Sequence, residues 1–119
     1  MTTSDIASKL VAYCRKGEFE AAQKELYSPD SVSIEPASSP AFAKETKGLQ
    51  AIITKGHTFN ATIEEYHSID VSDSIVAGQT FACVINLDVT MKGPGRTKMT
   101  EVAVYTVKDE KIIAEQFFY

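Results

Sequence analysis

The first half of the chain carries apolar residues at helical spacing. Over residues 4–16 these residues fall three or four positions apart, which predicts an amphipathic helix that ends at Lys16-Gly17. The same spacing predicts a short helix over 18–27 and a longer one over 48–60. The inner face of the longer helix would consist of Leu49, Ile52, Ile53, Gly56 and Phe59.

The second half alternates between apolar and polar residues, as half-buried strands do. An earlier short strand, 32–35, stops at Pro36, because proline restricts the residue before it. We predict a type II turn at Gly93-Pro94-Gly95-Arg96, with proline second and glycine third. The remaining predicted strands are 63–71, 74–77, 80–91, 98–107 and 111–119.

One long irregular stretch interrupts this pattern. Residues 36–47 lack either period, and a loop of that length in so small a domain is a candidate lid over a site. The helices come first and the run of antiparallel strands follows. This order predicts a single α+β domain over residues 1–119, with the helices packed against one face of a bent sheet.

Composition and charge exclude several kinds of partner. The chain has 119 residues and a formal net charge of −4, and its 12 lysines and arginines are scattered. Nucleic acids and anionic membranes need a basic surface, so we expect neither as a partner. The first residues lack the features of a signal peptide, and no apolar run approaches the ~20 residues of a membrane-spanning helix. We therefore expect a cytoplasmic protein.

Cysteines and motifs indicate neither a cofactor nor a metal. Cys14 and Cys83 fall on apolar faces of a predicted helix and strand, so we expect two reduced core residues. The sequence contains no phosphate-binding loop, no Gly-rich dinucleotide motif and no nucleophile-elbow serine. No spaced His/Asp/Glu motif supports a metal site. We expect no cofactor and no metal.

Glu101 is the most informative polar residue, because it directly precedes the apolar run Val102-Ala103-Val104-Tyr105. A charge in a buried pattern is costly unless it is partnered or used. The register of the hairpin before it decides its neighbours. A two-residue loop at Pro94-Gly95 would place Asp88 directly opposite Glu101, where like charges repel.

The next hairpin has two possible registers. A three-residue loop, 108–110, puts Glu115, Phe117 and Tyr119 on the face of Glu101, and we favour it over a two-residue loop, Asp109-Glu110. Either the carboxylates line a pocket and the other face is a dimer interface, or the other face is the core and the carboxylates are solvated. The first face would hold Asn86, Asp88, Glu101, Ala103, Tyr105, Glu115, Phe117 and Tyr119. The second would hold Cys83, Ile85, Leu87, Val89, Val102, Val104, Ala114 and Phe118.

Two segments resemble a known family. The runs Val11-Ala-Tyr-Cys-Arg-Lys-Gly-Glu-Phe-Glu-Ala-Ala and Leu26-Tyr-Ser-Pro-Asp-Ser-Val-Ser-Ile-Glu-Pro are similar to the opening of nuclear transport factor 2-like domains. The tail Glu101-Val-Ala-Val-Tyr-Thr-Val-Lys-Asp-Glu-Lys-Ile is similar to their closing hairpin. Within that superfamily the chain most resembles small bacterial SnoaL-like proteins. The resemblance implies a cystatin-like fold: a cone-shaped, curved sheet around a helix, with a pocket at the open end.

The resemblance also implies roles for the carboxylates. Glu35 stands where ketosteroid isomerases carry their general-base aspartate, and Glu101 stands where they carry the protonated aspartate of the oxyanion hole. Leu10 replaces their oxyanion-hole tyrosine, which argues against steroid isomerisation itself. In this hypothesis Glu35 is the base, Glu101 is the acid or hydrogen-bond donor, and Glu115 tunes the site.

Six further residues are candidates for ligand binding. Either histidine among them would orient a ligand or relay a proton, although a hydrogen-bonded histidine at the edge of a core is the commoner case. The three aromatic residues would form the apolar wall of a pocket on the Glu101 face. The candidates are His57, His67, Asp88, Tyr105, Phe117 and Tyr119.

Two classes of function fit these features. The first is a homodimeric pocket protein for a small apolar, oxygen-bearing molecule, with cofactor-independent proton transfer such as isomerisation, cyclisation, dehydration or hydrolytic ring opening. The second is a non-catalytic module that binds a small molecule, or that binds a partner or a second copy through the sheet face. A closed cavity containing both Glu35 and Glu101 is what the enzyme hypothesis requires.

Overall fold

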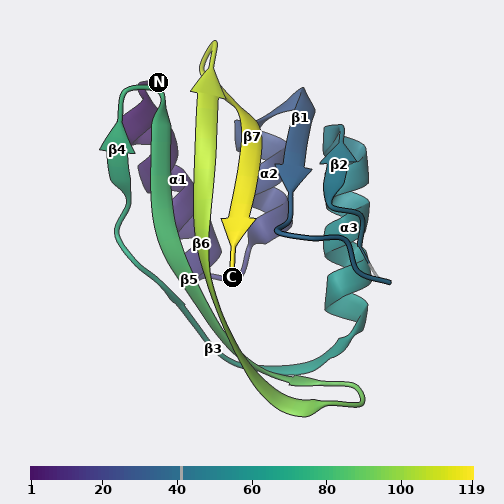
Figure 1. The fold of residues 1–119 in the computed structure, drawn as a ribbon. Coiled ribbons are helices and arrows are strands. Elements are labelled where there is room, and N and C mark those ends of the chain that lie inside the picture. Colours follow the sequence, from purple (N-terminus) through teal and green to yellow (C-terminus); the bar gives the residue numbers. More distant parts are fainter. Residues whose placement is uncertain (41) are drawn as a thin grey trace.

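A computed structural model describes residues 1–40 and 42–119 and places them in helices and one curved sheet (Figure 1). The helices are α1 (Thr3–Arg15), α2 (Phe19–Leu26) and α3 (Leu49–Ala61). The strands are β1 (Tyr27–Ile34), β2 (Glu45–Lys47), β3 (Ile63–Val71), β4 (Ile75–Ala77), β5 (Thr80–Met91), β6 (Gly95–Lys108) and β7 (Lys111–Phe118). None of the helices in the described part is long and apolar enough to cross a membrane.

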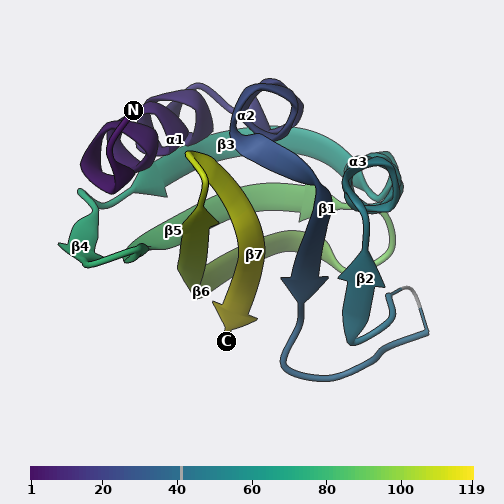
Figure 2. The ribbon, with the colours of Figure 1, turned by 90° about the horizontal axis from the view of Figure 1, so that it is seen from above.

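The strands form one sheet in the order β2-β1-β7-β6-β5-β3, with β4 also paired to β5. The pairs are antiparallel except for β1 and β7, which run parallel. Figure 2 shows the helices on the concave side of the sheet, with the long strands β3, β5 and β6 curving beneath them. The predicted α+β class, with helices on one face of a strongly curved, mainly antiparallel sheet, is confirmed.

β1 begins at Tyr27, directly after α2, and not at Val32 as predicted. Tyr27 pairs with Ile112 and Val32 pairs with Ala114, so the register shifts between the two pairs. The extra residues on β1 bulge out of the ladder, which lets a strand contain Pro29. The strand is therefore longer than the predicted 32–35 and contains a bulge around the proline.

The β5–β6 hairpin differs from the predicted register. Met91 pairs with Gly95, so the loop is three residues long and the predicted turn centred on Pro94-Gly95 is wrong. Glu101 therefore lies opposite Ile85, and Asp88 lies opposite Lys98. A shift of one residue in a loop moves every side chain of a strand to the other face of the sheet. Glu101 and the apolar side chains of β5 consequently lie on the same, concave face of the sheet. The core and the carboxylates, which the sequence analysis placed on opposite faces, therefore share one face.

The β6–β7 hairpin also has a different loop, yet the predicted face is right. Lys108 pairs with Lys111 through a two-residue turn in which Asp109 and Glu110 have φ angles of 51° and 62°. The register then shifts between Thr106 and Val107, where β7 contains one extra residue. Because of this bulge, the β7 residues that we predicted on the face of Glu101 do lie there: Tyr105 pairs with Glu115, and Ala103 pairs with Phe117.

The core lies between the helices and the concave face. Both cysteines are free and buried in it, as predicted. Phe81 and Tyr105 stack with their ring centroids 4.8 Å apart. On the opposite face of the sheet, Val102 and Phe118 are 40 % and 50 % exposed. The largest fully buried side chains are Phe81, Ile6, Leu10, Leu26, Ile52 and Ile112.

The Asp109-Glu110 turn generates a first prediction. Both residues have the positive φ of a type I′ turn, and that conformation costs a residue with a Cβ atom roughly 1–2 kcal/mol relative to glycine. We expect Glu110→Gly to melt a few degrees above Glu110→Ala in thermal unfolding. Both variants lose the contact between Glu110 and the N-terminal amine, so their difference isolates the backbone. Equal melting temperatures would contradict the prediction.

Candidate functional site

A cavity of about 600 Å³ lies between the three helices and the concave face of the sheet. That volume is in the range of pockets for drug-sized ligands. Its walls are mainly apolar and rich in aromatic rings: Phe19, Tyr27, Phe42, Phe59, Tyr66, Tyr105, Phe117 and Tyr119. Its charged lining residues are Glu35, Lys55, Lys98, Glu101 and Glu115. Of the predicted face, Asn86 and Asp88 of β5 do not line this cavity, whereas five residues do: Glu101, Tyr105, Glu115, Phe117 and Tyr119.

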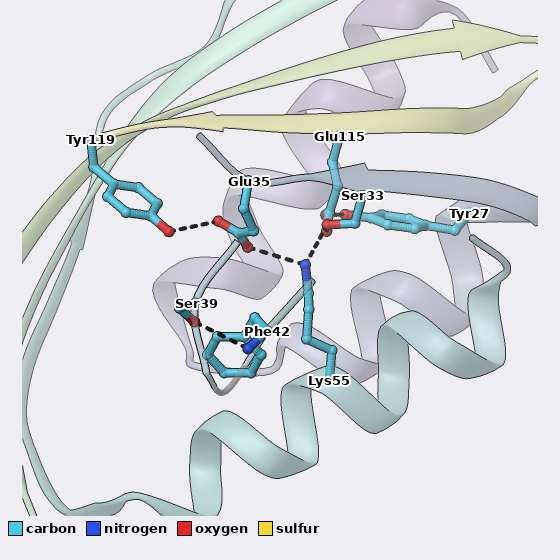
Figure 3. A network of polar contacts seen from close by, with 8 residues as sticks. All are labelled: Tyr27, Ser33, Glu35, Ser39, Phe42, Lys55, Glu115 and Tyr119. Carbon is cyan, nitrogen blue, oxygen red and sulfur yellow. Dashed lines mark hydrogen bonds and ion pairs between the residues drawn. The ribbon is translucent and has the colours of Figure 1, made fainter. Parts of the chain in front are cut away.

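Lys55 is the centre of a polar network at one side of this cavity (Figure 3). Its ammonium Nζ donates to Ser33 Oγ at 2.6 Å and to Glu35 Oε1 at 3.1 Å. The other oxygen of Glu35 accepts from the hydroxyl of Tyr119 at 2.9 Å. Nζ also lies 5.7 Å from the centre of the Phe117 ring, within cation–π range. Glu35 is thereby held as an ion-paired carboxylate with both oxygens engaged.

Glu115 extends the network into the interior. Ser33 Oγ donates to one of its carboxyl oxygens at 2.6 Å, and the hydroxyl of Tyr27 donates to the other. Glu115 is 3 % exposed, and burial raises its pKa although both hydrogen bonds lower it. Ser33 therefore connects the half-buried Lys55 ammonium to Glu115, and the three residues form one hydrogen-bonded unit.

Glu101 faces the cavity without such partners. Among the described residues, none forms a hydrogen bond or ion pair with its carboxyl group. Burial raises its pKa from 4.5 to about 7, and the negative charges of Glu35 and Glu115 add to that effect, while Lys55 opposes it. Burial and the two neighbouring carboxyl groups thus move the pKa of Glu101 toward neutral pH.

Local structure explains how distant residues meet here. Glu101 and Glu115 point inward because strand residues alternate between faces and the β7 bulge keeps the two in phase. Glu35 directly follows β1, and its amide donates to the carbonyl of Lys44, which fixes the chain beyond the strand. Lys55 comes from α3, three residues after the buried Ile52 and therefore on the same helical stripe.

The structure brings six of the nine predicted site residues into the cavity lining: Glu35, Glu101, Glu115, Tyr105, Phe117 and Tyr119. Sequence reasoning missed Lys55 and Ser33. A lysine on the apolar stripe of α3 and a serine at an inward position of β1 were the available signals.

The other three predicted ligand-binding residues lie outside the lining. The exposed His57 ring contacts Glu20 on α2, so its position on the edge of the α3 stripe turns it to the surface. His67 hydrogen-bonds Thr90 at 2.6 Å, from strand β3 to strand β5. The Asp88 carboxylate accepts two hydrogen bonds from Arg96, at 3.0 and 2.8 Å. The loop shift explains Asp88, because it moves that residue to the outer face.

The predicted lid also contributes to the site. Phe42, from the irregular stretch, is in the cavity lining, and its amide donates to Ser39 Oγ at 3.1 Å. The end of the stretch is strand β2, which pairs with β1. Ala41 lies outside the described residues. Among the residues that the structure describes, no group of three or more His, Cys, Asp or Glu side chains has an arrangement that would hold a metal ion.

Comparisons with known proteins identify the family. The model of the SnoaL-like domain matches residues 1–119. The chain belongs to the SnoaL-like family. A structure described as a proposed SnoaL-like polyketide cyclase from Mesorhizobium loti has 32 % sequence identity and a TM-score of 0.92, with all of both chains covered. The resemblance seen in the sequence is confirmed.

More distant SnoaL-like and related structures share the fold. A protein of unknown function with a cystatin-like fold from Xanthomonas campestris is 20 % identical with a TM-score of 0.82, over 99 % of this chain and 90 % of that one. IdmH, a proposed polyketide cyclase from Streptomyces antibioticus, is 19 % identical with a TM-score of 0.74, over 99 % and 91 %. Comparison with curated proteins finds no match.

The half-buried position of Glu101 in the cavity leads to a second prediction. Its raised pKa means that its contribution to stability is present at low pH and is lost as pH rises through about 7. The rise from 4.5 corresponds to roughly 3 kcal/mol. We expect Glu101→Gln to gain up to that amount over the wild type between pH 4 and pH 8.5, measured by urea unfolding. A constant difference across this range would show that the carboxyl is solvated.

The matched substitution at Glu115 has the opposite expected result. Both of its oxygens accept hydrogen bonds from buried hydroxyls, and an amide replaces one acceptor by a donor. A buried group that loses its partner costs about 1–3 kcal/mol. We expect Glu115→Gln to lower the free energy of unfolding by this amount at pH 7, where Glu101→Gln does not. A Glu115→Gln variant as stable as the wild type would contradict the network.

Proposed function

We propose that this SnoaL-like protein binds a small, largely apolar, oxygen-bearing molecule in the cavity and catalyses a proton transfer on it. The observation that carries the proposal is the presence of two carboxyl groups with different environments in one cavity. Glu35 is ion-paired with Lys55, whereas Glu101 lacks partners among the described residues and has a pKa near neutral pH. Such a difference divides the roles of base and acid between two similar side chains.

The chemistry follows from these environments. Glu35, which is ion-paired with Lys55, is suited to accept a proton from a carbon or oxygen of the ligand. The protonated Glu101 is suited to donate a hydrogen bond, or its proton, to an oxygen on which negative charge develops. Isomerisation, ring closure, dehydration and hydrolytic ring opening all use this pair of steps, and none of them needs a cofactor for the proton transfer itself.

The relatives support the class of reaction without naming the substrate. The Mesorhizobium loti protein is described as a proposed polyketide cyclase, and polyketide chains are apolar molecules with many carbonyl oxygens. A cyclisation begins when a proton leaves a carbon next to such a carbonyl. The mainly apolar lining and the two carboxyls of this cavity are compatible with a substrate of that kind.

One observation favours binding without catalysis. Both oxygens of Glu35 already accept hydrogen bonds, from Lys55 and Tyr119, so a base would have to exchange one of these partners for the substrate. A receptor for a small molecule needs no such exchange.

We also propose that the outer face of the sheet, with the exposed Val102 and Phe118, forms a homodimer contact.

The test is a screen of ketones, lactones and epoxides for turnover by the wild-type protein, followed by variants. We expect Glu35→Gln and Glu101→Gln each to lower the turnover of an identified substrate by about 10²–10⁴-fold, since neither amide can transfer the proton. The control is Glu18→Gln, an exposed glutamate outside the cavity lining, which should leave turnover unchanged. Binding without turnover, or turnover that survives both cavity variants, would favour the receptor.

A further inference from the structure

The two hydrogen bonds on the carboxylate of Glu35 come from donors in different surroundings. Lys55 Nζ donates to Oε1 at 3.1 Å, and the hydroxyl of Tyr119 donates to Oε2 at 2.9 Å. Figure 3 shows the two donors on different sides of the carboxylate, Lys55 on α3 and Tyr119 just beyond β7. A ligand that uses Glu35 has to take the place of one of them.

Lys55 is held firmly in its place. Its side chain is 14 % exposed, and its ammonium also donates to Ser33 Oγ at 2.6 Å. Ser33 donates in turn to Glu115, so the ammonium is part of a continuous network. Removing Lys55 would leave the carboxylate of Glu35, which is only 13 % exposed, without its ion pair. An enclosed charge that loses its partner is strongly destabilising, so Lys55 stays with Glu35 when a ligand enters.

Tyr119 is held much more loosely. It directly follows β7 and is 73 % exposed, and within the described part of the chain its hydroxyl forms a hydrogen bond with Glu35 alone. Turning its ring outward costs little burial, and the hydroxyl regains hydrogen bonds in water. The ring nevertheless lines the cavity, where a ligand would approach Glu35. Tyr119 is therefore the partner of Glu35 that a ligand can replace.

The hydroxyl of Tyr119 also indicates which chemical group replaces it. Desolvation of this hydroxyl and its hydrogen bond to Glu35 raise the pKa of Tyr119 to about 12, so it remains a neutral O–H donor. An ion-paired carboxylate only accepts hydrogen bonds, and an ether or ketone oxygen has no hydrogen to donate. A phenol carries the required O–H, and so does the enol form of a ketone. The position at Oε2 is thus already shown to accept a phenolic hydroxyl.

We propose that Tyr119 is a specificity-determining residue that competes with the ligand for Glu35. A ligand with a phenolic or enolic hydroxyl displaces the Tyr119 hydroxyl from Oε2, and the ring turns outward. A ligand that lacks a hydroxyl leaves Tyr119 on Glu35 and binds only to the apolar walls. The inference rests on the ligand-binding part of the proposed function and adds the hydrogen-bonding chemistry of the ligand.

A matched pair of probes tests this competition in the wild type and in Tyr119→Phe. The probes are 2-naphthol and 2-methoxynaphthalene, which have the same ring system with and without an O–H donor. In the wild type 2-naphthol gains a hydrogen bond where Tyr119 loses one, so we expect similar affinities for the two probes. In Tyr119→Phe that loss is absent, and we expect the preference for 2-naphthol to rise about tenfold in fluorescence titrations at pH 6.

The control is Tyr66→Phe, which removes the hydroxyl of another tyrosine of the cavity lining. That hydroxyl donates to Asn60 and not to Glu35. We expect Tyr66→Phe to change the affinities for both probes by the same factor. Both rings are exposed, at 73 % for Tyr119 and 39 % for Tyr66, so neither substitution removes a core contact. The inference is overturned if Tyr119→Phe also changes both affinities alike, or if Tyr119→Phe does not bind 2-naphthol.

The displacement itself is observable in the unmodified protein. Carbon-13 at the ring carbon that carries the tyrosine hydroxyl gives an NMR signal for each tyrosine, and Tyr119→Phe assigns the signal of Tyr119. Saturating 2-naphthol should move this signal toward its position in Glu35→Ala, where the hydroxyl has lost its acceptor. The ether probe should not do so, and it controls for the effect of the naphthalene ring itself. Bound 2-naphthol that leaves the Tyr119 signal as the ether probe does contradicts the displacement.

These measurements also separate the inference from the proposed catalysis. If no substrate is turned over while the probe and NMR results hold, the catalytic proposal fails and the competition at Glu35 stands. If turnover depends on Glu35 and Glu101 while Tyr119→Phe changes the affinities for both probes alike, the competition fails alone.

Discussion

The site depends on one ammonium group that serves two carboxyls, the half-buried Glu35 and the buried Glu115. Lys55 is 3.1 Å from Glu35 and reaches Glu115 through the hydroxyl of Ser33. Buried charges are tolerated when they are paired and their remaining hydrogen bonds are satisfied. Here Glu35 is ion-paired with Lys55, and both oxygens of Glu115 accept hydrogen bonds from hydroxyls. The carboxyl groups of this cavity outnumber the ammonium group beside them, and among the described residues Glu101 is the one without a hydrogen bond or ion pair. Burial is the main reason why the pKa of Glu101 is raised to about 7; the negative charges of Glu35 and Glu115 add to that rise, and Lys55 opposes it.

The curved sheet makes this arrangement possible because it brings strand faces and helices around a common space. Glu101 and Glu115 come from adjacent strands, Glu35 from the end of β1, and Lys55 from the facing side of α3. The walls contributed by aromatic residues keep the space apolar, so each polar group in it has a large effect. Wide apolar walls with a few convergent polar groups are the general form of small-molecule sites.

Much of the fold and part of the site could be predicted from the sequence. Helical and alternating periods placed the helices and long strands, because those patterns reflect burial on one face. The β5 face was assigned wrongly because the loop between Met91 and Gly95 has three residues, and loop length is a choice among turns of similar energy. The β7 face was assigned correctly through two differences that cancel, a shorter turn and a bulge. Lys55 and Ser33 were not predicted as site residues, because their importance comes from contacts between segments far apart in the sequence.

The parallel pairing of β1 with β7 has a consequence for folding. The contacts that define the polar network join residues 88, 84 and 82 positions apart: Tyr27 with Glu115, Glu35 with Tyr119, and Ser33 with Glu115. Contacts of such long range are slow to form, because the chain must close a large loop before it gains any energy from them. During synthesis the helices and β1 are complete while β7 is still missing. The cavity is thus among the last features to assemble, and until then the inward-facing serines and glutamates of the first half remain accessible to water.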